Sequence, residues 1–143
     1  MVSQRQLTWA GWLGAMDYDD LMYIHLATVL PCVVLGTSLL VIRKGTRLHR
    51  GMGAAYMVLM LTTALTTLFM SAQVGPVLLG HFGWIHLFSV LTFYTVPAAY
   101  LDIQKRNVKA HGRKMIMLYF GALVVAGGFT LVPGRYLHDL LFG

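Results

Sequence analysis

The chain has 143 residues, of which 57% are hydrophobic and only 11% are charged, and its formal net charge is +6. A soluble domain usually carries about a quarter of charged residues, so this composition excludes a soluble globular protein and indicates an integral membrane protein. In a membrane protein the positive charge indicates topology, and nucleic acid is not an expected partner. The single cysteine, Cys32, excludes an intramolecular disulfide.

Four apolar segments follow an interfacial segment at residues 1–20, in which Trp9 and Trp12 suit the membrane surface. Each apolar segment is close to the roughly 20 residues that a spanning helix needs. We therefore predict an all-α fold, a four-helix bundle with up-down topology that forms a single transmembrane domain over residues 1–143. The predicted spans are about 21–42, 51–70, 85–101 and 115–132. Small residues in the second and fourth spans favour close helix packing, at Ala54, Ala55, Gly121, Gly127 and Gly128.

The segments between the spans differ sharply in charge. Nine of the eleven Lys and Arg residues lie within 43–50 and 105–114, whereas residues 71–84 carry no charge. Basic loops stay on the cytoplasmic side of a membrane, so both termini are expected outside. The chain is predicted to cross the membrane several times, and residues 71–84, which include His81, form an outer loop.

Four of the six histidines recur at matched depths. His25 and His86 lie near the outer ends of the first and third spans, and His49 and His111 lie at the inner starts of the second and fourth. Alternate helices of an up-down bundle are diagonal, so each pair could meet across the bundle axis. Two imidazoles on opposite sides of a porphyrin hold a b-type haem, and helical bundles build such sites in their cores. The pattern predicts one or two haem b groups with these histidines as iron ligands.

Two further observations refine this hypothesis. Arg50 and Arg113 are candidate contacts for the propionates of an inner haem. The outer pair is the stronger candidate, because an imidazole inside the apolar zone is costly unless it has a function. A structural role is the alternative, since interfacial histidines often snorkel or cap helices, and stripes of Met and aromatic residues usually serve packing.

The histidine-bearing segments also carry a resemblance. A histidine early in the first span, His49-Arg50-x-x-Gly53-x-x-Tyr56 at the second, and His111-x-Arg113-x-Met115 at the fourth resemble an uncharacterised family of bacterial four-helix membrane proteins. The histidine layout is also similar to the transmembrane b-type cytochromes that carry electrons from ascorbate or quinol to ferric iron. In those proteins histidines of alternate helices hold the haems; this chain departs from them in being short and in placing its inner histidines at helix ends.

Two functions therefore remain open. The first is a membrane electron-transfer protein of b-type cytochrome character, a membrane oxidoreductase that takes electrons from a quinol or an ascorbate-type donor. The second is a cofactor-free accessory subunit of a larger respiratory or photosynthetic membrane complex. The lipid bilayer is the expected environment, and the candidate partners are a quinone, other membrane subunits and a second copy of the chain. A small transporter is less well supported, because no carboxylate lies within a span.

Overall fold

The computed structural model describes residues 17–71, 78–134 and 136–143. The predicted interfacial segment therefore lies almost wholly outside the described residues, and its last three positions, 18–20, already belong to the first helix.

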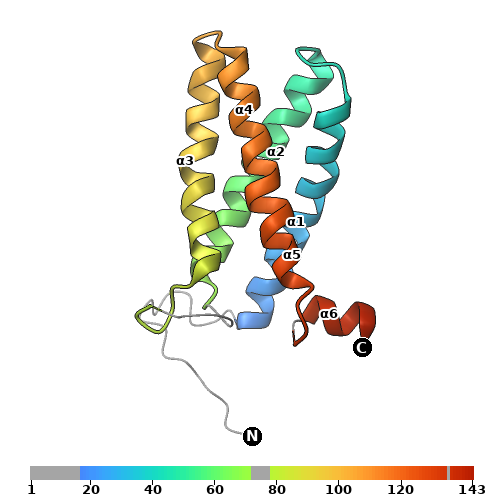
Figure 1. Cartoon of the computed structure of the whole chain (residues 1–143), viewed down its shortest axis with the longest axis vertical. Coiled ribbons are helices and arrows are strands. Elements are labelled where there is room, and N and C mark those ends of the chain that lie inside the picture. The colour runs from blue at the N-terminus through green and yellow to red at the C-terminus, as the bar shows by residue number, and fades with distance from the viewer. Residues whose placement is uncertain (1–16, 72–77, 135) are drawn as a thin grey trace, which may run out of the picture.

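Four helical spans make up the described chain, as the sequence predicted (Figure 1). The first three are α1 (Tyr18–Val41), α2 (Arg47–Phe69) and α3 (Trp84–Gln104). The fourth is continuous but not uniform. It consists of α4 (Val108–Leu118), a π-helical segment η1 (Tyr119–Val125) and α5 (Ala126–Thr130), and a short helix, α6 (Tyr136–Phe142), follows.

The second and fourth spans begin one to two turns earlier than the apolar segments. Thr46 caps α2 by accepting a hydrogen bond from the His49 amide at 3.1 Å, and Asn107 caps α4 by accepting one from the Ala110 amide at 3.2 Å. A capped first turn satisfies amides that have no intrahelical partner, so the helix extends into the polar residues. Hydropathy alone therefore starts these two spans too late, and both His49 and His111 lie within helices.

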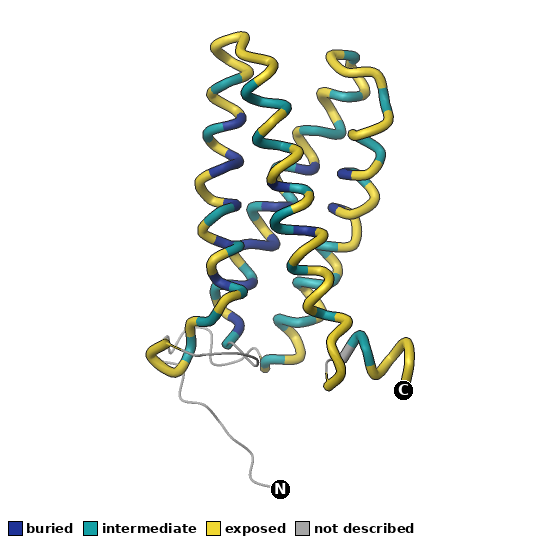
Figure 2. Tube along the Cα trace, viewed as in Figure 1, coloured by how far each residue is buried: buried dark blue, intermediate teal, exposed yellow. Residues whose placement is uncertain are grey.

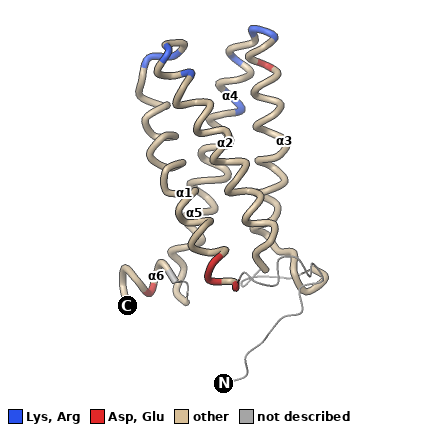
Figure 3. The backbone as a smooth tube through the Cα atoms, turned by 180° about the vertical axis from the view of Figure 1, so that it is seen from behind, with Lys and Arg blue, Asp and Glu red and all other residues tan. Residues whose placement is uncertain are grey.

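The helices form a ring in which each packs against its neighbours in sequence, and η1 also contacts α1. α1 therefore lies diagonal to α3, and α2 to the fourth span, as predicted for an up-down bundle (Figure 1). The loops 42–46 and 105–107 lie at one end, together with all nine described Lys and Arg residues, and we call this the basic end (Figure 3). The start of α1 and the loop 78–83 lie at the opposite end.

The buried core is small, and buried positions alternate with exposed ones along every span (Figure 2). Most large apolar side chains face outward, as expected where lipid replaces water. The core cluster consists of Cys32, Tyr56, Met60, Val96, Leu118 and Leu123.

Two helices approach each other closely at Gly36, a glycine that the sequence places on the same face of the first span as His25. A Cβ atom at Gly36 would lie 2.5 Å from Cδ2 of Tyr119, so α1 and η1 can approach this closely only because Gly36 has no side chain. The prediction of close packing was wrong for Gly127 and Gly128, where a Cβ would meet no described atom within 4 Å. At Gly121 the nearest contact, 3.6 Å, is ordinary.

Candidate functional site

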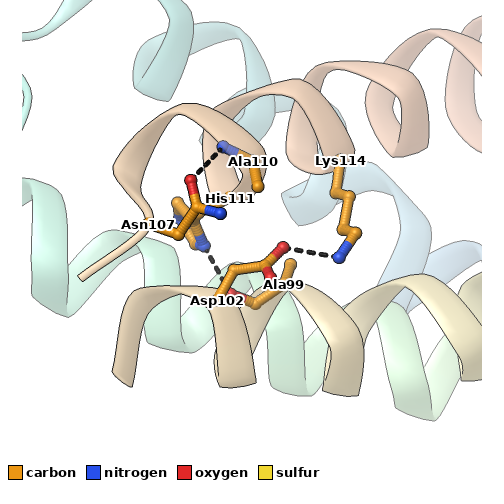
Figure 4. A network of polar contacts seen from close by, with 6 residues as sticks. All are labelled: Ala99, Asp102, Asn107, Ala110, His111 and Lys114. Atoms are coloured by element: carbon orange, nitrogen blue, oxygen red, sulfur yellow. Dashed lines mark hydrogen bonds and ion pairs between the residues drawn. The ribbon is translucent and has the colours of Figure 1, made fainter. Parts of the chain in front are cut away.

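His111 at the basic end has a defined hydrogen-bond state. Its Nδ1 lies 2.8 Å from the carbonyl oxygen of Ala99 on α3 (Figure 4). A carbonyl can only accept, so Nδ1 carries the proton and Nε2 is left with a lone pair. Metal-bound histidines commonly show this arrangement, with the second ring nitrogen held by a backbone carbonyl. His111 is therefore oriented and protonated as a ligand would be.

His49 lies in the first turn of α2, within range of an electrostatic interaction with His111. Its Nδ1 is buried and has no hydrogen-bond partner among the described residues. A buried polar atom without a partner is rare in a folded protein and points to an unseen ligand, a water molecule or a cost in stability. Each ring of the predicted inner pair therefore has a nitrogen that no hydrogen bond to a described residue occupies.

The predicted propionate contacts are less well placed. Arg50 and Arg113 are both exposed. At about 100° per residue, Arg113 lies on the face of α4 opposite His111, and Arg50 lies a quarter turn or more from His49 on α2. The neighbouring Lys114 instead pairs with Asp102 at 2.5 Å, which links α4 to α3 (Figure 4).

His25 at the opposite end is held by threonines of α2. Its Nδ1 lies 3.1 Å from Oγ1 of Thr67, whose hydroxyl also lies 2.9 Å from the Thr63 carbonyl. The carbonyl takes the hydroxyl proton, so the Thr67 oxygen accepts from Nδ1–H of His25. Nε2 of His25 therefore also has a free lone pair.

His86 is in a different state from the other predicted ligands. It is only 4% exposed, and its Nδ1 accepts a hydrogen bond from the Gly83 amide at 3.1 Å, which caps α3. Nε2 of His86 must then carry the proton. This nitrogen is buried, and although the carbonyls of Leu68 and Met70 lie near the ring, neither meets the geometry of a hydrogen bond. Ligation of iron through Nε2 would therefore displace the proton and disturb the cap.

His81, in the loop that precedes α3, lies beside His86. The ring centroids of His81 and His86 are 5.3 Å apart, and His81 donates from Nε2 to the Leu68 carbonyl at 2.9 Å. From the sequence, His81 was predicted only to lie in a loop. No group of three or more metal-binding side chains occurs in the described ranges, so a metal site here would depend on two imidazoles.

Sequence reasoning missed two features of the middle of the bundle. Tyr56 is 1% exposed, and its hydroxyl has no hydrogen-bond partner in the described part of the chain. The π-helical segment η1 places Tyr119 against Gly36, with its hydroxyl 2.8 Å from Oγ1 of Thr37. π-helical turns often occur at functional sites, but the pattern of residue types in this span does not predict one.

The fold and composition together define a multi-pass α-helical membrane protein. Within that class the chain belongs to the predicted membrane protein family DUF2306, whose sequence model matches residues 22–140. No curated protein and no solved structure matches the chain.

Proposed function

We propose that this protein is a membrane electron-transfer protein of b-type cytochrome character, with a haem held at the basic end by His49 and His111. The observation that supports the proposal best is the hydrogen-bond state of this pair. Nδ1–H of His111 donates a hydrogen bond to the Ala99 carbonyl, and His49 has a buried nitrogen without a partner among the described residues. Two imidazoles on diagonal helices are the ligand set that a bis-histidine haem needs.

The histidines at the opposite end support a second haem less well. His25 presents a free Nε2, but the Gly83 amide fixes His86 in the other tautomer. The proposal therefore ranks the basic-end pair above the outer pair, which reverses the order drawn from hydropathy. A haem bound there would supply one-electron chemistry, and the chain would provide axial ligands and an apolar surrounding. A quinol or ascorbate-type donor in the bacterial inner membrane is the proposed electron source.

A cofactor-free accessory subunit of a larger membrane complex is the second candidate. Hydrogen bonds within the chain also account for His25, His86 and His111 as structural residues: His25 joins α1 to α2, His86 caps α3, and His111 joins α4 to α3. Among the described residues, a structural role does not explain the buried nitrogens of His49 and His86 that have no hydrogen-bond partner.

The absorption spectrum of the protein purified from haem-replete cells tests the two functions. Bis-histidine ligation gives low-spin haem, so we expect a sharp Soret band that shifts on reduction with dithionite. His111→Ala and His49→Ala should each remove the basic-end haem, whereas His138→Ala, outside the four spans, should leave the spectrum unchanged.

His86→Ala separates the two histidine pairs. We expect it to retain the basic-end haem, because the two pairs share no ligand. Protein that is colourless and stays so after added hemin would reject the cytochrome function. The accessory role would then predict co-purification with other subunits from native membranes.

A further inference from the structure

An apolar groove lies on the outside of the bundle between α2 and α3. It has a volume of about 310 Å³, and its lining includes Ala54, Val58, Leu61, Val96, Pro97 and Tyr100. Ala54, Val58, Pro97 and Tyr100 are exposed, so in a membrane the groove opens to lipid. Its volume is at the lower end of the roughly 300–1,000 Å³ of small-molecule sites.

Two arginines continue the groove toward the basic end. Arg47, Arg50, Ala54, Met57, Val58 and Leu61 fall within a sector of about 100° around α2, at about 100° per residue. Gln104 continues the α3 side in the same way, because it lies one helical turn beyond Tyr100. Apolar side chains and polar head-group contacts therefore share one face.

The guanidinium groups on this face have no acidic partner. Asp102, the acid nearest to them in the fold, pairs with Lys114, and neither Arg47 nor Arg50 forms an ion pair within the described residues. Both arginines are exposed at the level where α2 leaves the apolar zone. They are thus available to an anion at the membrane surface.

We infer that this surface binds one anionic phospholipid, with its phosphate on Arg47 and Arg50 and an acyl chain in the groove. The dimensions fit, because the axial distance from Arg50 to Leu61 is about 16 Å at 1.5 Å per residue. That is close to half of the roughly 30 Å hydrocarbon core, the depth of one leaflet. Basic pockets between helices at a membrane surface commonly bind anionic head groups.

A second apolar groove has no described Lys or Arg residue near it, so we do not expect it to prefer an anionic lipid. It has a volume of about 460 Å³ and lies along Leu87, Phe88, Val90, Leu91 and Tyr94, in the half of α3 away from the basic end. None of the nine described Lys and Arg residues lies at that end (Figure 3). Of these two grooves, the one between α2 and α3 combines an apolar floor with cations that form no ion pair among the described residues, so it is the one expected to select an anionic lipid.

Native mass spectrometry of the detergent-purified protein tests the inference without any haem signal. Phosphatidylglycerol and phosphatidylcholine with identical acyl chains are titrated at fixed ionic strength. We expect the anionic lipid to bind at least tenfold more tightly, because each arginine near the head group contributes roughly fivefold. Equal affinity for the two lipids would overturn the proposal.

Variants separate a built site from general attraction to a basic surface. Arg50→Gln should weaken phosphatidylglycerol binding about fivefold, whereas Lys109→Gln, which removes the same charge from α4, should change it little. Ala54→Phe fills the groove and keeps every charge, and it should weaken phosphatidylglycerol binding because the acyl chain loses its place. Val58→Phe, at a position 64% exposed, repeats that test should Ala54→Phe fold poorly.

Three further results would overturn the inference. Equal losses in Arg50→Gln and Lys109→Gln would show unspecific attraction, and unchanged binding in both groove variants would show that no acyl chain occupies the groove. Displacement of the lipid by an equal concentration of glycerol phosphate would show a site for a free phosphate. We expect the lipid to stay bound when glycerol phosphate is present at the same concentration.

Discussion

Tyr56 is the residue whose environment is hardest to explain from packing alone. It is 1% exposed in the core cluster, its ring lies beside Gly36, and its hydroxyl has no described partner. An orphaned buried hydroxyl costs about 1–3 kcal/mol. Nearby, the hydroxyls of Thr28 and Thr63 pair with each other at 2.9 Å, so the interior of the α1–α2 pair supports hydrogen bonds where geometry allows.

Tyr56→Phe should raise the melting temperature in detergent, because it removes the unpaired hydroxyl and keeps the ring. Tyr119→Phe is the matched control and should lower it, since it loses the 2.8 Å hydrogen bond to Thr37, a contribution of about 0.5–1.5 kcal/mol. A loss of stability in Tyr56→Phe would contradict an orphaned hydroxyl and indicate a bound water molecule or ligand.

The sequence predicts where the histidines lie but not what each ring nitrogen does. Matched depths follow from counting residues along spans and stay a prediction; the helix packing confirms only that alternate spans are diagonal. The protonated nitrogen of His111 depends on the Ala99 carbonyl, and that of His86 depends on the Gly83 amide. These partners are set by turn geometry and by neighbouring helices, so hydropathy and spacing could not reveal that only one of the two presents Nε2.

At the scale of the helices, the fourth span departs most from expectation. Its apolar pattern predicted a regular helix, whereas the middle is the π-helical segment η1. The extra residue per turn changes the direction of side chains, and here Tyr119 lies against Gly36 of α1. This contact joins two different helices, so the local sequence of the fourth span does not reveal it.

Gly36→Ala tests the contact between α1 and η1. A Cβ at this position would lie 2.5 and 2.7 Å from two ring atoms of Tyr119, and overpacking of this kind costs about 1–3 kcal/mol. We expect a lower thermal midpoint, measured by circular dichroism in detergent.

Gly53→Ala is the control for that substitution. A Cβ there would meet no described atom within 4 Å, and the change should stabilise α2 by about 0.5–1 kcal/mol. If both variants melted at the temperature of the parent protein, the close approach at Gly36 would be refuted.

For the whole molecule, charge is the feature that orients the fold in the membrane. All nine described Lys and Arg residues lie at the basic end, whereas Asp17, Asp19, Asp20 and Asp139 lie at the other (Figure 3). Only Asp102 offsets the positive charge of the basic end, through its pair with Lys114. Acidic residues contribute little to orientation, so the Lys and Arg bias decides it.

We therefore expect the basic end to face the cytoplasm. A reporter inserted at Asn107 should be active on the cytoplasmic side, and one fused at Gly143 should be active on the periplasmic side. Replacing Arg43, Lys44, Arg47 and Arg50 with Gln removes four of the nine charges. It should produce a mixed orientation, because only the basic residues within 105–114 then still favour the cytoplasmic side for this end. The reverse assignment in the parent protein would place the His49–His111 pair and the lipid groove in the outer leaflet. It would leave their geometry intact but would require the electron donor and the anionic lipid to be sought on the other side of the membrane.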